Sequence, residues 1–383
     1  MVRVAIGFRY SSILNQSIRR NAKTLDGEGH RSMYSAREML CREAHARMAK
    51  WRGCLAGLVA VILVGAASAR AQHSTDDGLT ISLEEMIKAH HGKVAVYARQ
   101  LNSSHQIAID ANEPVQTASV IKLAILYNAM VDIREGKASW DEKLTLKPGE
   151  AVGGSGLFHF LDTPLTVTLK DVLTLMVIMS DNTATNMAID RFGVDAVNAR
   201  VESLGLKNTH LYKKVMKPAT GPLPADYAKF GLGKTTPWEM AEIIEQIGEC
   251  HLRRADGVTT GLTGWAPMDD KDKAVCDVAL TMLKDQFYRE TIPRYLPNGG
   301  DQTVASKTGS LNAVRNDVAL VAGKSGPMVI SIFTYDNQDQ SWTVDNTAEM
   351  LIARMAKAIV DAWSPDGLDA KTMVPGLGLQ PPK

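Results

Sequence analysis

Apolar residues along this chain change between a strand-like and a helical spacing, and these changes divide it into blocks. Near residues 93–110, and again after residue 299, short apolar stretches alternate with polar residues or end at turn signals, a pattern typical of strands. Between residues 165 and 297, and near 348–363, apolar residues recur at helical spacing. The pattern predicts one sheet whose strands come from both ends of the chain, with a helical block inserted between them.

The expected strands are Lys93–Arg99, His105–Asp110, Thr303–Ser306, Val318–Ala322 and Met328–Tyr335. The expected helices are Ser119–Glu135, Thr168–Met179, Ala184–Phe192, Val194–Leu204, Pro237–Ile247, Val275–Lys284 and Ala348–Trp363. They form a single domain over residues 80–364, with a sheet part at 80–117 and 299–364 and a helical part at 118–298. We expect residues 365–383, which contain prolines, to be a loose tail.

The leading 71 residues have the features of a targeting segment. Lys50 and Arg52 precede an uncharged run from Cys54 to Ala66, and small-residue cleavage sites follow at residues 67–71. These are the three parts of a secretory signal, and the run is short for a membrane span of about 20 residues. A signal normally starts near the N-terminus, so we expect Met48 to be the true start; the alternative is a real cytoplasmic extension. We expect a bacterial protein that is exported to the periplasm or secreted, with no stable membrane span once the signal is cleaved.

Composition and charge further restrict the class of protein and the partners that residues 72–383 can have. The chain is 45% hydrophobic and 22% charged, as in ordinary globular proteins. Residues 1–71 hold 12 of the 43 basic residues but only 4 of the 42 acidic ones, so the body is net acidic and gives no reason to expect nucleic acid as a partner. Cys41 and Cys54 fall in the leading segment, which leaves Cys250 and Cys276 as either one disulfide or two buried thiols. The histidines have no metal-ligand spacing, and we expect neither a metal nor a cofactor.

Ser119 and Lys122 form a Ser-x-x-Lys at the start of an apolar run. In a helix, residues three apart share a face, so the lysine amine could take the serine proton if burial lowers its pKa. One such motif would occur by chance in a chain of this length. Two more sequences follow in order: Ser180-Asp181-Asn182, and Lys307-Thr308-Gly309-Ser310. The coincidence of three motifs indicates serine acyl-transfer chemistry.

This ordered set resembles the signature of the class A β-lactamase and penicillin-binding serine hydrolase superfamily, over nearly all of residues 80–364. The match is nearer to class A, because residues 180–186 carry that family's second Asn, residues 234–237 resemble its Thr-x-Pro helix start, and residues 315–317 resemble its strand after Lys-Thr-Gly. The resemblance implies an α/β (α+β) β-lactamase/transpeptidase-like fold: an antiparallel five-stranded sheet flanked by helices, with an inserted all-helical subdomain.

The resemblance also implies a role for each motif residue. Ser119 would be the nucleophile, Lys122 its base or proton relay, and Ser180 the proton donor to the leaving nitrogen. Lys307 would tune Ser180 electrostatically and help to bind the substrate carboxylate. The expected substrate-binding residues are Asn182, Thr308, Gly309, Ser310 and Arg315. For Arg315, a surface strand position without such a role is an equal alternative.

One departure from the family concerns hydrolysis of the acyl-enzyme. Class A enzymes carry Glu-x-x-Leu-Asn in the loop before the Thr-x-Pro helix, and its glutamate activates the deacylating water. Here residues 212–234 contain no glutamate. Their single carboxylate, Asp226, is the candidate deacylation base, although an Asp in a loop is more often a turn or cap residue.

Three functions therefore remain open. The first is a secreted β-lactamase-like serine hydrolase that opens β-lactams through a Ser119 acyl-enzyme, with slow deacylation. The second is a penicillin-binding-protein-like D,D-peptidase or esterase acting on cell-wall peptides, and the third is a β-lactam sensor that stays acylated. In each case the partner is a small molecule or peptide and the expected state is a monomer.

Overall fold

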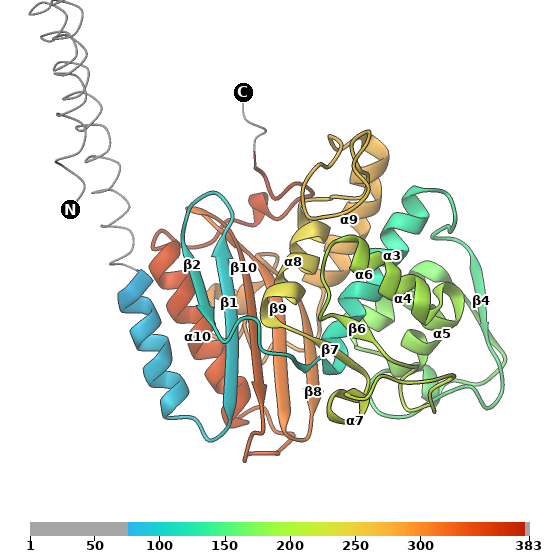
Figure 1. The fold of residues 1–383 in the computed structure, drawn as a ribbon, viewed down its shortest axis with the longest axis horizontal. Helices are drawn as coiled ribbons and strands as arrows, with labels where there is room; N and C mark the ends of the chain where they lie inside the picture. Colours follow the sequence, from blue (N-terminus) through green and yellow to red (C-terminus); the bar gives the residue numbers. More distant parts are fainter. Residues whose placement is uncertain (1–75, 380–383) are drawn as a thin grey trace, which may run out of the picture. The chain divides into compact units, whose positions relative to one another are not determined.

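The computed structural model describes residues 76–379, so the predicted signal, the Met48 start and two of the four cysteines lie outside the described residues. Its largest sheet has five antiparallel strands in the order β2-β1-β10-β9-β8 (Figure 1). The strands are β1 (Lys93–Gln100), β2 (Gln106–Ile109), β8 (Val304–Leu311), β9 (Val314–Gly323) and β10 (Gly326–Tyr335). The predicted fold class, with strands drawn from both ends of the domain, is confirmed.

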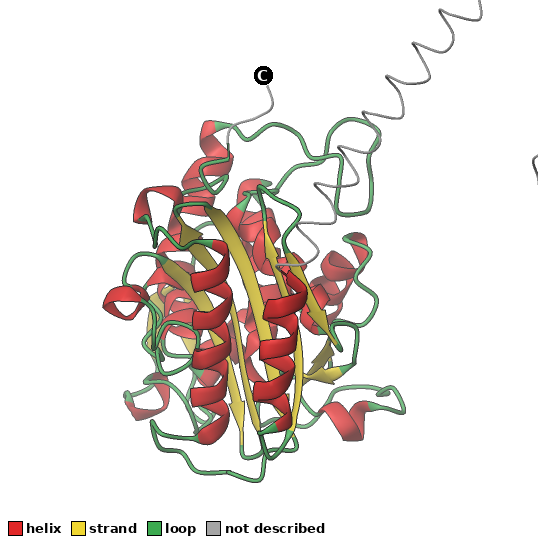
Figure 2. Ribbon diagram, turned by 90° about the vertical axis from the view of Figure 1, so that its left-hand side faces the viewer, coloured by secondary structure: helices red, strands yellow, loops and turns green. Residues whose placement is uncertain are grey.

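The central strands are buried on both faces, which explains their long apolar runs. Because successive side chains point to opposite faces, Val321 packs with the helix at 76–88 and α10 (Thr347–Trp363), whereas Leu320 packs with the cluster that includes α8 (Pro237–Gly248). Figure 2 shows the helix at 76–88 and α10 side by side across one face of the sheet. The sheet is therefore the middle layer of three.

The helical part lies beyond the β8 edge of the sheet, with α3 (Lys122–Arg134) at its centre (Figure 1). Almost every side chain of α3 is buried, so this helix is apolar all round rather than amphipathic. Around it are α4 (Leu169–Ile178), α5 (Asn182–Phe192), α6 (Val194–Ser203) and α9 (Asp270–Lys284). The shorter elements are α7 (Tyr227–Phe230), β3 (Val115–Gln116), β4 (Lys143–Leu146), β5 (Leu165–Thr168), β6 (His210–Leu211), β7 (Gly233–Thr235), η1 (Ala118–Ile121), η2 (Phe158–Phe160), η3 (Pro297–Gly300) and η4 (Ala370–Thr372).

Two segments differ from the sequence-based division. Helix α8, placed in the helical part by its position in the chain, packs directly against β1, β9 and β10. The expected loose tail is ordered over residues 365–379: Met373 and Leu377 are buried, and the Gly376 N–H donates to the Gly248 carbonyl at 2.9 Å. Buried apolar side chains and backbone hydrogen bonds thus attach a segment that its prolines suggested would be loose.

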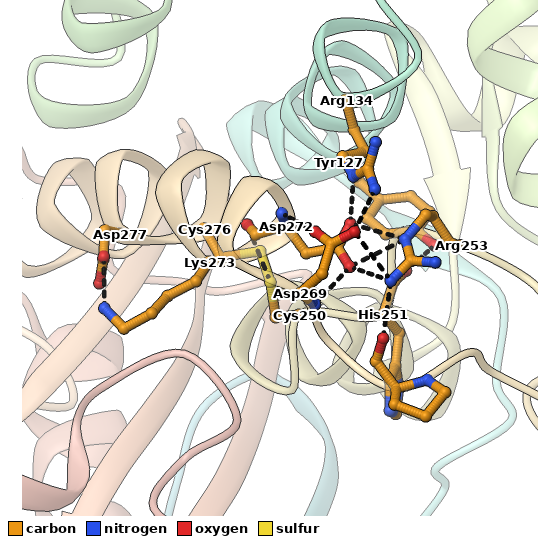
Figure 3. Close-up of a disulfide and its surroundings, with 11 residues drawn as sticks. Tyr127, Arg134, Cys250, His251, Arg253, Asp269, Asp272, Lys273, Cys276 and Asp277 are labelled. Atoms are coloured by element: carbon orange, nitrogen blue, oxygen red, sulfur yellow. Dashed lines mark hydrogen bonds and ion pairs between the residues drawn. A yellow bond between two sulfur atoms is a disulfide. The ribbon is translucent and has the colours of Figure 1, made fainter.

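A disulfide joins Cys250, after the end of α8, to Cys276 in α9 (Figure 3). Beside it, the buried carboxylate of Asp272 accepts hydrogen bonds from Arg134 and Arg253. Of the two alternatives left open for these cysteines, the structure has the disulfide. Within residues 76–379 no helix is both long enough and apolar enough to cross a membrane.

Candidate active site

Ser119 lies in η1, the short 3₁₀ turn that leads into α3. The turn packs against the edge strand β8, where a Cβ on Gly309 would lie 2.8 Å from the Thr117 carbonyl oxygen and 3.0 Å from the Ser119 nitrogen. Asn316, on β9, donates from Nδ2 to the Gln116 carbonyl at 2.9 Å. Glycine at 309 and this hydrogen bond thus hold the nucleophile's backbone close to the sheet edge.

Lys122 is completely buried one turn after Ser119. Its Nζ donates to the Ser180 carbonyl at 2.7 Å, the Ser180 Oγ at 3.0 Å and the Asn182 Oδ1 at 3.3 Å. Burial, and then repulsion from Lys307, lower the pKa of Lys122 well below its usual 10.5. The lowered pKa favours the neutral amine, which is the form that a proton acceptor must have.

Lys307 approaches the same hydroxyl from β8. It is also fully buried, and its Nζ donates to the Ser180 Oγ at 3.2 Å and to the Thr308 carbonyl at 2.8 Å. Burial lowers the pKa of Lys307 to about 7, although the nearby Asp317 favours its charged form. Ser180 therefore lies between two lysines that can exchange one proton through its hydroxyl.

Asp181 organises the loop opposite Ser119, a role that the sequence did not reveal although the residue stands inside a motif. Its buried carboxylate caps α5 through the Ala184 N–H at 2.8 Å and accepts the Leu157 and Phe158 N–H groups at 2.6 and 2.8 Å. Gly156 has φ 111° and lies so close that a Cβ there would overlap the Asp181 side chain. The segment 153–156 thus contributes Gly154 and Ser155 to a wall of the site.

These elements surround a cleft of about 480 Å³. Its lining comprises Ser119, Gly154, Ser155, Ser180, Tyr288, Glu290, Thr291, Thr308, Ser310, Trp342, Thr343, Val344 and Glu349. The predicted residues Ser119, Ser180, Thr308 and Ser310 thus meet in one open hollow, with Lys122 and Lys307 buried behind it. A larger cavity, of about 590 Å³ under the loop at 213–224, contains none of the three motifs.

Comparison with known proteins agrees with this geometry. The family model described as "Beta-lactamase enzyme family" matches residues 79–259 and 271–363. The chain belongs to the beta-lactamase enzyme family. Its fold is also similar to that of solved structures of class A β-lactamases and of PBP-A.

Three of these structures have identities of 20–24%. A β-lactamase from Sphaerobacter thermophilus is 24% identical at a TM-score of 0.60, over 73% of this chain and 95% of that one. A mutant of PBP-A, solved as an acyl-enzyme complex with penicillin G, is 21% identical at 0.60, over 76% and 97%. An ancestral class A β-lactamase is 20% identical at 0.60, over 74% and 99%. At these identities the likeness concerns the fold.

Arg315 lies apart from the cleft of this family member. Its guanidinium is buried and does not line the hollow, and it lies beneath the Trp342 ring at 4.5 Å from the ring centroid. Its hydrogen-bond acceptors are the carbonyls of Leu311, Val314 and Ser341 and the Glu349 carboxylate. Direct contact of Arg315 with a substrate carboxylate stays a prediction, one that this arrangement does not favour.

Asp226 is also outside the cleft lining. Its carboxylate accepts hydrogen bonds from the Tyr212 hydroxyl at 3.1 Å and from the Lys234 Nζ at 2.6 Å, and these partners lower its pKa. A water-activating base would have to reach the cleft, so the deacylation role of Asp226 remains a prediction without geometric support here. Among the described residues, no group of three or more His, Cys, Asp or Glu is arranged to hold a metal ion.

Proposed function

We propose that this protein is an exported serine hydrolase that reacts with β-lactams through a Ser119 acyl-enzyme and releases the product slowly. The observation that carries the proposal is the Ser180 hydroxyl, held between two buried lysines at 3.0 and 3.2 Å beside an accessible Ser119. Such a chain of groups can move a proton from the nucleophile to the leaving group.

In the proposed acylation, neutral Lys122 takes the Ser119 proton as Oγ bonds to the lactam carbonyl carbon. The carbon–nitrogen bond then breaks, the Ser180 hydroxyl protonates the leaving nitrogen, and the Lys122 ammonium returns a proton to Ser180. The backbone N–H groups of Ser119 and Ser310 would stabilise the oxyanion, while charged Lys307 and the hydroxyls of Thr308 and Ser310 would bind the substrate carboxylate.

Deacylation is the weaker half of the proposed cycle. In the loop that precedes α8, the Val215 backbone is fixed by two hydrogen bonds with the Asn186 side-chain amide, and neither Val215 nor its neighbours carry a carboxylate in the cleft. The carboxylates that line the cleft are Glu290 and Glu349, and Glu349 is paired with Arg315. Because the loop before α8 brings no carboxylate into the cleft, we infer a long-lived adduct, which also suits the alternative of a penicillin-binding-protein-like peptidase.

Intact mass against time after addition of penicillin G tests this proposal. We expect one adduct of the mass of penicillin G that decays over minutes or longer and is absent in Ser119→Ala. Ser325→Ala is the control, because it removes an exposed serine hydroxyl outside the cleft lining and should acylate normally. Decay within seconds would overturn the slow deacylation, an adduct that never decays would favour the peptidase or sensor, and no adduct would reject the reaction.

We also propose that the protein acts outside the cytoplasm. The support is the Cys250–Cys276 disulfide, since such bonds persist in oxidising compartments, together with the signal-like sequence at residues 48–71. N-terminal sequencing of the protein recovered from the periplasm should find a start just after residues 67–71. A start at Met1, with Cys250 and Cys276 reduced, would contradict export.

A further inference from the structure

The loop between β10 and α10 forms one wall of the cleft and presents apolar side chains to solvent. Trp342 is 66% exposed and Val344 59% exposed, and both line the hollow that contains Ser119. Tyr288 lies in the same lining and is also exposed. Water-exposed indole surface is unfavourable at roughly 25 cal/mol per Å², so a cluster of this kind beside a nucleophile favours contact with an apolar ligand group.

The Trp342 ring is held in place rather than free. The Arg315 guanidinium packs under the indole at 4.5 Å from its centroid, a cation–π contact that occupies one side of the ring. The Arg315 Nη2 also donates to the Ser341 carbonyl at 2.6 Å, and its Nε to the Glu349 Oε1 at 2.8 Å. Ser341, the residue before Trp342, is therefore hydrogen-bonded to the same buried guanidinium that packs under the indole.

Two further residues fix the ends of this loop. Asn346 donates from Nδ2 to the Asp339 and Ser341 carbonyls at 3.2 and 3.0 Å, and its Oδ1 caps α10. Asp339 in turn accepts the Thr347 N–H at 2.8 Å. A loop held by both ends and by Arg315 loses little entropy when a ligand binds, which favours a recognition role for the indole it presents.

We propose that Trp342 is a specificity-determining residue that stacks on a flat apolar substituent, such as an aromatic ring, of the acylating substrate. Arg315 is its positioning residue: it acts through Trp342 and does not contact the substrate. This inference rests on the acylation proposed above. It specifies that substrates with such a flat apolar substituent acylate Ser119 fastest. A stacked aromatic pair contributes roughly 0.5–1.5 kcal/mol, which corresponds to about a two- to tenfold preference.

The test compares two penicillins that differ only in one phenyl ring, penicillin G and 6-acetamidopenicillanic acid. The second-order acylation constant is measured for each by time-resolved intact mass. We expect Trp342→Ala to reduce the ratio of the two constants about two- to tenfold, through penicillin G alone. Trp342→Phe should keep most of the ratio, and Phe287→Ala, which removes a ring that is 61% exposed but outside the cleft lining, should leave it unchanged.

Arg315 is tested by a double-mutant cycle with the same two substrates. Arg315→Met should lower the ratio as Trp342→Ala does, the double variant should lower it no further, and Arg315→Lys should restore part of it by keeping a cation under the ring. Equal losses for both penicillins in Arg315→Met, or additive losses in the double variant, would overturn the positioning role. Should the Arg315 variants not fold, Trp342→Ala and Trp342→Phe still decide the specificity role.

The outcomes separate this inference from the proposed function. If both penicillins acylate the wild type and Trp342→Ala leaves their ratio unchanged, the specificity role is wrong while the acylation stands. If neither penicillin forms an adduct with the wild type, the proposed function fails and this inference falls with it.

Discussion

Two residues in or next to the catalytic motifs adopt a backbone conformation that residues other than glycine rarely take. Ala118, next to the nucleophile, has φ 45°, and Ser180 has φ 52°. A left-handed conformation costs roughly 1–2 kcal/mol for such residues, and it persists where the surroundings hold it. Here Lys122 binds both the carbonyl and the hydroxyl of Ser180. The strain coincides with the placement of the hydroxyl between the lysines, as expected of a functional site.

The two lysines also predict a pH profile. Acylation should fall as the pH drops through the lowered pKa of Lys122, because the protonated amine cannot accept the Ser119 proton. It should also fall as the pH rises past about 7, where Lys307 loses the charge that attracts the substrate carboxylate. Because the two amines interact, each limb of the pH profile reports the titration of the pair rather than of one lysine. We expect the second-order acylation constant of penicillin G to depend on pH as a bell whose alkaline limb lies above about pH 7.

Lys307→Arg is the control for the alkaline limb. Arginine keeps its charge at all these pH values, so the alkaline limb should be absent from Lys307→Arg, provided that this variant still acylates. A constant that stays level from pH 6 to 9 in the wild type would contradict the assignment to Lys307.

Helix α8 carries an unusual set of carboxylates on the side that packs against β1. Glu242 and Glu245 are buried and both lie near Arg99, which forms its short ion pair with Glu245. Burial, and then the charge of Glu245, raise the pKa of Glu242 to about 7. Arg99 thus carries one positive charge beside two carboxylates. The raised pKa means that folded Glu242 binds a proton at pH values at which the unfolded chain would release it.

Glu242→Gln should therefore stabilise the protein at alkaline pH. The folded-state pKa of about 7 exceeds the unfolded value of 4.5, so the free energy of unfolding of the wild type falls as the pH rises from 4.5 through 7. Gln releases no proton, and we expect a gain of about 1–3 kcal/mol at pH 8 that shrinks toward pH 5. Urea denaturation at both pH values measures it, with the exposed Glu84→Gln as control. A difference that does not change with pH would contradict the prediction.

At the scale of the whole domain, the C-terminal segment packs against both α8 and the sheet. Leu377 is buried, and its two Cδ atoms would lie only 3.0 and 3.1 Å from a Cβ on Gly248 at the end of α8. The segment also pairs with the sheet, through a bridge between Gly323 and Leu368. Residues after α10 therefore belong to the core of the domain and connect the sheet to α8.

Leu377→Ala should lower the free energy of unfolding by about 2–4 kcal/mol, because it removes buried methyl groups and leaves a cavity. The same change at the neighbouring exposed Val374 should cost less than about 0.5 kcal/mol. Urea unfolding of the two variants provides the comparison. Equal midpoints would show that the segment adds nothing to stability.

The sequence predicted the parts of this molecule whose information is local. The strands, most helices and the three motifs follow from spacing, and the order of the motifs was sufficient for the family. The attachment of Leu377 to α8, the packing of α8 on the sheet and the burial of Arg315 under Trp342 depend on residues far apart in the chain. Arg315 illustrates the limit, because its motif position is the same whether its guanidinium points into the cleft or away from it.

The pairing of β1 with β10 has a consequence for how the protein is made. Lys93 on β1 lies opposite Tyr335 on β10, so β1, which also pairs with the nearby β2, cannot pair with β10 until more than two hundred further residues have been synthesised. Such distant pairings slow folding, and domains generally fold only once their partners are available. The central sheet can therefore be completed only late in synthesis, when β9 and β10 become available to join β1 to β8.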